Sequence, residues 1–185
     1  LSTEAASEVA ERHGCKLVLF VDAGMLVRLR EEAVNYPALN RDLSAVKRQL
    51  EQLSKRGHDA QLHIHTHWQD CSFDGNCWNL SSRRYKLHDF EPVEILRIVA
   101  DYRAALADIV SEQVFAYRAG GWCVQPFAAL AKAGVWLDSS VIVDGKALDS
   151  TDFSQAPRKS YWNFKTDSTV EDPKGPFVEV PISAV

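Results

Sequence analysis

Residues 57–71 read GHDAQLHIHTHWQDC and combine a glycine, an alternating strand pattern and three histidines at alternate positions. On an extended strand, residues two apart point to the same face. His63, His65 and His67 would therefore share one face if the strand stayed regular to its end. We expect instead that the strand ends near Ile64 and that the chain then turns. Two or three imidazoles would then converge at the carboxyl end of this strand.

Patterns typical of helices and strands alternate through the rest of the chain. Apolar residues at helical spacing and cap residues predict helices at about 2–13, 39–56, 91–113 and 125–134. Short apolar or alternating runs predict strands at 16–21, 58–64, 114–119, 135–143 and 177–182. The alternation indicates an α/β fold with a parallel sheet or a β/α barrel. Such folds carry function in the loops after the carboxyl ends of the strands.

The strand expected at 16–21 is a continuous apolar run, which is typical of a strand covered on both faces. Three other segments depart from the alternation of helices and strands. A polar connection that contains a proline is expected after residue 21, and an irregular segment at 144–175. The stretch 68–90 has no period and is long for a loop, a length usual in functional or disordered segments. Its aromatic residues argue against disorder, because they need burial or a ligand: Trp68, Phe73, Trp78 and Tyr85.

Length and composition indicate one ordinary globular domain. The chain has 185 residues, of which 46% are hydrophobic and 25% charged, and its net charge is −4 with acids and bases interleaved. Nucleic acids and anionic membranes are poor partners for such a chain, because phosphate binding relies on clustered Lys and Arg. No apolar run approaches the roughly 20 residues that a membrane span needs. Compartment and oligomeric state stay open.

The histidine triplet is a candidate metal site. Neutral imidazole is the commonest nitrogen ligand of zinc and similar ions, and a catalytic site takes about three protein ligands and leaves a position for water. The alternative is a solvated or hydrogen-bonded set of histidines. We favour the metal, because His63, His65 and His67 recur at alternate positions before an acidic loop. His58, directly after a helix, is expected to be a structural or surface residue.

Two cysteines lie in the long loop. Cys71 and Cys77 could be free, disulfide-bonded or bound to a metal, and their spacing does not choose among these states. A structural zinc site made by both cysteines and two histidines is one alternative. It predicts that Cys71→Ser unfolds the domain, because structural zinc contributes folding energy directly.

Four stretches in order resemble the motifs of the polysaccharide deacetylases of carbohydrate esterase family 4. They are HGCKLVLFV (13–21), GHDAQLHIHTH (57–67), YRAGGW (117–122) and GVWLDSSV (134–141). The second is the most specific, because glycine, histidine and the H-x-x-x-H pair keep their spacing. The resemblance covers roughly residues 3–143. It implies a single catalytic domain over 1–185 with a distorted (β/α) barrel. The fold would be incomplete at both ends, because the family's first motif, an aspartate pair, and its last, L-x-H, are not in the sequence.

The resemblance also implies a function and a set of site residues. It implies a metal-dependent hydrolase that removes N- or O-acetyl groups from a carbohydrate substrate. A divalent ion, zinc first, would be held by His63 and His67, with His65 as an alternate or supporting ligand. Arg118 would be the catalytic arginine that orients the base by a charge-assisted hydrogen bond.

Four further residues are expected to contribute to substrate binding: Trp68, Gly120, Trp122 and Asp138. Gly120 replaces the family's usual proline. Trp122 could equally be packed under the loop, and Asp138 could simply cap a turn with the serines that follow it. Asp22 is expected near the site without an assigned role.

Two other functions remain open from the sequence. Amidohydrolase-type β/α barrels use an H-x-H pair at a strand end, and His63 with His65 would serve. Such enzymes place further His and Asp at later strand ends, whereas this chain has no histidine after His88. A catalytically inactive carbohydrate-binding relative would keep the fold and the aromatic loop but lack the base.

Overall fold

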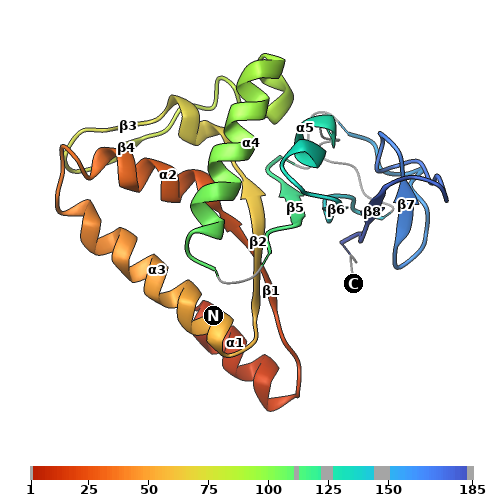
Figure 1. The fold of residues 1–185 in the computed structure, drawn as a ribbon, viewed down its shortest axis with the longest axis horizontal. Helices are drawn as coiled ribbons and strands as arrows, with labels where there is room; N and C mark the ends of the chain where they lie inside the picture. The colour runs from red at the N-terminus through yellow and green to blue at the C-terminus, as the bar shows by residue number, and fades with distance from the viewer. Residues whose placement is uncertain (1, 111–112, 122–126, 144–150, 183–185) are drawn as a thin grey trace.

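The computed structural model describes residues 2–110, 113–121, 127–143 and 151–182, which form a mixed α/β structure (Figure 1). Its helices are α1 (Thr3–Arg12), α2 (Ala23–Glu32), α3 (Leu39–Lys55), α4 (Pro92–Ala107) and α5 (Phe127–Lys132), with 3-10 turns η1 (Thr66–Asp70) and η2 (Leu87–Asp89). Its strands are β1 (Val18–Asp22), β2 (Asp59–Ile64), β3 (Ser72–Phe73), β4 (Trp78–Asn79), β5 (Ala116–Ala119), β6 (Leu137–Asp138), β7 (Trp162–Phe164) and β8 (Phe177–Glu179).

Six strands form one mostly parallel sheet. The strand order is β1-β2-β5-β6-β8-β7, and β7 alone runs antiparallel to its neighbour. The α/β class with a parallel sheet is therefore confirmed. The closed barrel is not: β1 and β7 are the two edges of an open sheet in the described part of the chain. Each edge strand pairs on one side only, so the sheet has no closing ladder.

The two faces of the sheet differ. Leu62, Ile64 and Tyr117 are buried in the main core together with the apolar sides of α2 and α4. The alternate residues of β1, such as Val18 and Phe20, line open cavities instead. Val18 is 55% exposed. The expectation that the strand at 16–21 is covered on both faces is therefore wrong.

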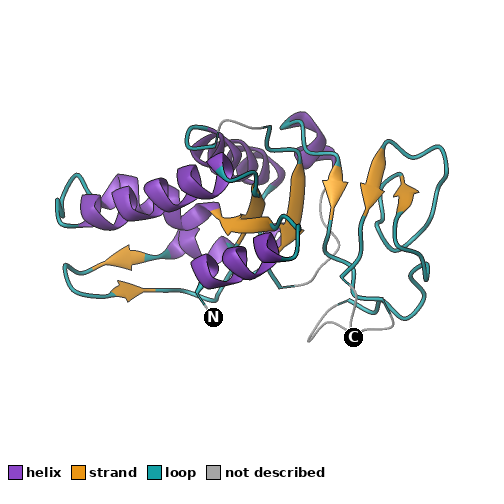
Figure 2. Ribbon diagram, turned by 90° about the horizontal axis from the view of Figure 1, so that it is seen from below, coloured by secondary structure: helices purple, strands orange, loops and turns teal. Residues whose placement is uncertain are grey.

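The longer helices lie at one end of the molecule. α2, α3 and α4 lie beside β1 and β2, whereas the short α5 lies beside β5 and β6, and β7 and β8 lie at the opposite end (Figure 1). Seen from below, the longer helices again lie at one end and the end opposite them is made of strands and loops (Figure 2). Parallel strands point the same way, so the carboxyl ends of β1, β2 and β5 meet at one edge of the sheet.

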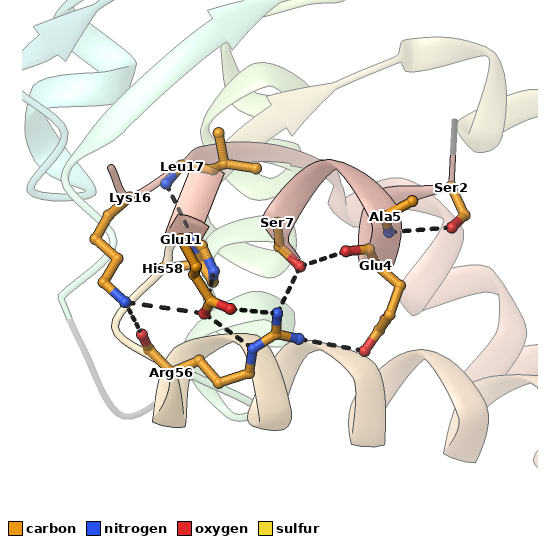
Figure 3. Close-up of polar contacts among 9 residues, drawn as sticks. All are labelled: Ser2, Glu4, Ala5, Ser7, Glu11, Lys16, Leu17, Arg56 and His58. Atoms are coloured by element: carbon orange, nitrogen blue, oxygen red, sulfur yellow. Dashed lines mark hydrogen bonds and ion pairs between the residues drawn. The ribbon is translucent and has the colours of Figure 1, made fainter. Parts of the chain in front are cut away.

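A polar network fixes the start of β2 against α1 (Figure 3). Arg56, at the end of α3, donates two hydrogen bonds to the carboxylate of Glu11, from Nε at 3.0 Å and from Nη2 at 2.9 Å. These bonds are the main reason that the pKa of Glu11 is lowered to about 2. His58 Nδ1 accepts the N–H of Leu17 at 3.0 Å, and its Nε2 lies 3.1 Å from Glu11 Oε1. His58 is buried and structural, which is one of the two roles, structural or surface, that its position after the helix left open.

Some expected elements are shorter or were missed. A helix, α2, forms much of the segment after residue 21, where a polar connection was expected. Its buried residues after Gly24 recur at helical spacing. The helix expected at 91–113 ends at Ala107. The stretch 68–90 is made of short turns and the two-stranded β3–β4 pair. The segment expected to be irregular contains β7.

Candidate functional site

The histidines lie where β2 ends. β2 stops at Ile64, His65 is still extended with φ −103° and ψ 114°, and a 3-10 turn begins at Thr66. The ring centroids of His63 and His65 are 4.5 Å apart, and those of His65 and His67 are 5.0 Å apart. The expected turn after Ile64 is therefore confirmed, and it brings all three imidazoles together.

His63 is held in one orientation by the neighbouring strand. Its Nδ1 lies 2.8 Å from the carbonyl oxygen of Arg118, to which it donates a hydrogen bond. Burial is the main reason that the pKa of His63 is lowered to about 4, so the ring is neutral at pH 7. With the proton on Nδ1, the lone pair is on Nε2, which is the form in which a histidine binds a metal or accepts a proton.

His65 and His67 are also neutral imidazoles. Burial lowers the pKa of both side chains, and the proximity of His65 lowers that of His67 further. His65 Nδ1 is buried without a hydrogen-bond partner among the described residues. A Cβ at position 120 would lie 2.9 Å from this nitrogen and would overlap the carbonyl oxygen of Ile64. Gly120 is thus needed for close packing of β5 against the histidine turn.

Arg118 is anchored between two strands. Its Nε donates to the carbonyl oxygen of Ser139 and its Nη2 to Ser139 Oγ, both at 2.8 Å. Its guanidinium lies 4.3 Å from the ring centroid of Phe20 on β1. No hydrogen bond from Arg118 to an aspartate is present in the described residues, so its role toward a catalytic base stays a prediction.

A cavity of about 430 Å³ opens beside these groups. Its lining consists of Val18, Leu19, Phe20, His63, His65, Tyr85, Arg118, Ala119, Gly120 and Gly121. A volume of this order is typical of small-molecule sites. His63, His65, Arg118 and Gly120 are thus brought together, whereas His67 lies just outside this lining.

Trp68 is directed away from the cavity. Its Nε1 donates to Asp22 Oδ2 at 2.7 Å, and its ring packs edge-on against Trp78 at 5.3 Å between centroids. A Cβ at position 24 would lie 2.8 Å from Trp68 Cδ1, so Gly24 makes room for this indole. Burial raises the pKa of Asp22, whose Oδ1 has no partner among the described residues. A contact of Trp68 with substrate stays a prediction, and Trp122 lies outside the described residues.

Asp138 has no exposed surface and lies in a buried carboxyl pair. Its partner is Glu179, which is opposite it in the register of β6 and β8 and also fully buried. Ser140 Oγ donates to Asp138 Oδ1 and accepts the N–H of Ala119, next to the cavity. Asp138 therefore supports the end of β5 through the hydroxyl of Ser140. Asp138 is not part of the cavity lining, and its expected contribution to substrate binding stays a prediction.

The histidines meet only part of what a metal needs. They offer neutral nitrogen donors, but no three His, Cys, Asp or Glu side chains are arranged to hold an ion anywhere in the described ranges. Cys71 is buried with its Sγ donating to the carbonyl oxygen of Trp68 at 3.1 Å, and Cys77 is exposed; both thiols are free. The divalent metal therefore stays a prediction, in a catalytic or a structural site.

The sequence pattern did not single out every residue of the cavity. Tyr85 was conspicuous only as one aromatic among four in a loop. Phe20 and Gly121 carried no signal of their own, because their place in the lining depends on strand register. Glu179 could not be paired with Asp138 before the neighbouring position of β6 and β8 was known.

A solved structure has a fold similar to that of this chain. It is described as a "putative polysaccharide deacetylase from Mycobacterium smegmatis", and the two structures superpose with a TM-score of 0.53 at 16% sequence identity. The match covers 95% of this chain and 43% of that one, so this chain spans less than half the length of that protein. No protein-family model and no curated protein sequence matches the chain. None of the described helices is long and apolar enough to cross a membrane. The comparison shows a fold similar to that of this protein, and at this identity it shows the fold alone.

Proposed function

We propose that this chain carries the histidine side of the active site of a metal-dependent hydrolase that removes N- or O-acetyl groups from a carbohydrate. The observation that carries the proposal is His63, a neutral imidazole whose Nδ1–H is bound to the Arg118 carbonyl at the end of β2. Histidines that bind metals almost always donate their other ring N–H in this way. The likeness to the mycobacterial protein supports the choice of reaction.

The chain's own groups would supply binding and orientation. His63 and His67, or His63 and His65, would hold a divalent ion, with zinc favoured by the nitrogen donors. Such an ion polarises a carbonyl oxygen and lowers the pKa of a bound water. Arg118, fixed by Ser139, would present a positive charge to an anionic or oxygen-rich group in the cavity. The remaining ligands and the catalytic base are not assigned among the described residues.

A second ligand pattern has an observation in its favour. His63 and His65 both line the cavity, whereas His67 does not. This favours the H-x-H pair of amidohydrolase-type enzymes over the H-x-x-x-H pair. Single substitutions distinguish the two, because only one of His65 and His67 would be a ligand in each.

Zinc titrations of the wild type and four alanine variants test the proposal. We expect His63→Ala to weaken zinc binding at least about tenfold, as loss of a ligand does. His13→Ala, in an exposed histidine, is the matched control and should leave binding unchanged. Loss in His67→Ala with binding kept in His65→Ala supports the deacetylase pattern, and the reverse supports the H-x-H pattern.

Acetate release from zinc-loaded protein tests the reaction. Acetylated oligosaccharides should release acetate with the wild type and not with His63→Ala. A wild type that binds no divalent metal, or a His63→Ala variant that binds zinc as well as the wild type, would overturn the proposal.

A further inference from the structure

Tyr85 forms one wall of the cavity that contains the histidines. It comes from the loop before η2, is 39% exposed, and has its ring centroid 6.2 Å from that of His65. His63 and Arg118 belong to the same lining. The loop therefore places an aromatic side chain in the cavity in which we propose that the reaction occurs.

The ring of Tyr85 rests on a glycine at the end of β5. Gly121 has φ +80°, and a Cβ at this position would lie 2.8 Å from Tyr85 Cε1. A left-handed backbone favours glycine, and the missing side chain is what allows the ring to approach. The position of Tyr85 is therefore defined by the strand end as well as by its own loop.

The backbone beside Tyr85 is clamped from two sides. Thr66, in the histidine turn, donates its hydroxyl to the carbonyl oxygen of Arg84 at 2.8 Å. The guanidinium of Arg84 bonds to Asp70 Oδ2 at 2.9 Å and to Glu94 Oε1 at 3.2 Å, and it lies 4.0 Å from the ring centroid of Phe90. These contacts hold the segment that carries Tyr85 before a ligand binds, which lowers the cost of ordering it on binding.

The chemistry of this lining fits a sugar ring. A pyranose has an apolar face of C–H groups and a polar edge of hydroxyls, so it can stack on an aromatic ring while its edge meets polar groups. Tyr85 offers the aromatic surface, and His63, His65 and Arg118 offer the polar side. Arg118 is the charged residue in the described lining, which favours a neutral or anionic sugar over a cationic one.

We propose that Tyr85 is the stacking platform that holds a pyranose ring of the substrate beside His63 and His65. The choice of a carbohydrate rests on the proposed function. The platform itself is inferred from three observations: the position of Tyr85 in the cavity, its close contact with Gly121, and the hydrogen bonds that hold Arg84.

Binding of a defined oligosaccharide to matched variants tests this role. The probe is tetra-N-acetylchitotetraose, with an O-acetylated xylotetraose as the second probe, titrated into metal-free protein and followed by calorimetry. The variants are Tyr85→Ala, Tyr85→Leu, Tyr85→Phe and, as control, Tyr161→Ala, whose tyrosine is 64% exposed and outside this cavity. Circular dichroism and thermal unfolding check that each variant is folded.

The expected pattern separates stacking from simple apolar packing. Tyr85→Ala and Tyr85→Leu should weaken binding on the order of tenfold, because neither keeps a flat ring. Tyr85→Phe should bind within about threefold of the wild type, and Tyr161→Ala like the wild type. Binding by Tyr85→Ala equal to that of the wild type overturns the inference, as does a wild type that binds neither probe.

Acetate release separates this inference from the proposed function. If binding depends on Tyr85 but zinc-loaded protein releases no acetate, the platform stands and the proposed reaction fails. If acetate is released with KM and kcat unchanged in Tyr85→Ala, the reaction stands and the platform fails. In an active protein we expect Tyr85→Ala to raise KM more than it lowers kcat, since the platform holds ground state and transition state alike.

Discussion

His58, just before β2, and His63, on β2, show how hydrogen bonding decides what an imidazole can do. Both ring nitrogens of His58 are occupied, Nδ1 by the N–H of Leu17 and Nε2 by Glu11. The single bond of His63 uses Nδ1 and leaves Nε2 for chemistry at the cavity. The first residue is therefore a structural element of the fold and the second a candidate ligand, although both follow the same glycine in sequence.

His58→Ala should destabilise the protein by about 2–3 kcal/mol. The substitution leaves the partly buried N–H of Leu17 without its acceptor, removes a partner of Glu11 and opens a small cavity in place of the buried imidazole. Urea unfolding measures the change in the free energy of unfolding. His13→Ala is the control, since His13 is exposed and should change stability by less than about 0.5 kcal/mol. Equal stability of the two variants would show that the network in Figure 3 contributes little.

At the scale of elements, the end of β5 is supported by two buried carboxyl groups on β6 and β8. Burial raises the pKa of both Asp138 and Glu179. The negative charge of Asp138 raises the pKa of Glu179 further, whereas the hydrogen bond with Glu179 acts to lower the pKa of Asp138. Asp138 Oδ2 and Glu179 Oε2 have no donor among the described residues, and a proton shared by the pair provides one. The groups around the pair include the hydroxyls of Ser140 and Ser168, the N–H groups of Ser139 and Val141, and the more distant Arg118.

The pair makes stability depend on pH in a defined direction. Because the folded-state pKa lies above the unfolded one, the native state binds more protons, and stability falls as pH rises above about 4.5. Glu179→Gln mimics the protonated acid: its amide donates to Asp138 and its carbonyl accepts from Val141. We expect the variant to lose less stability than the wild type between pH 5 and 8, by at least about 1 kcal/mol or about 2–4 °C in Tm.

Thermal unfolding across this pH range checks the prediction. Glu51→Gln, on the exposed side of α3, is the control and should follow the wild type at every pH. Parallel pH profiles for Glu179→Gln and the wild type would contradict a shared proton.

The elements that the sequence predicted are those whose pattern is local. The end of β2 followed from alternation and the turn after it, and α1, α3 and α5 followed from spacing and caps. α2 was missed because Gly24 is a poor helix former, and its place there is explained by the Trp68 ring that packs against it. The convergence of three imidazoles was predictable, whereas the pairing of Asp138 with Glu179 and the place of Tyr85 in the cavity depend on contacts between distant segments.

At the scale of the whole molecule, the open sheet is the feature that most shapes behaviour in solution. Parallel sheets are normally covered on both faces. Here the face opposite the core carries a second cavity of about 440 Å³, lined by apolar residues that include Val18, Phe20, Leu137 and Val180. Val18 is 55% and Val180 37% exposed. This face therefore presents exposed apolar side chains beside polar ones such as Gln61 and Arg118, and apolar surface of this kind binds hydrophobic dyes.

Val18→Lys should lower the fluorescence of 8-anilinonaphthalene-1-sulfonate bound to the 185-residue chain. A lysine at this position of the edge strand β1 replaces apolar surface by a hydrated charge, and the side chain is exposed enough that stability should change by less than about 0.5 kcal/mol. Val34→Lys is the matched control, because Val34 is 81% exposed and lies after α2, away from the sheet. Equal changes in dye fluorescence for both variants would contradict binding at the open face, and a decrease confined to Val18→Lys locates the binding surface on that face of the sheet.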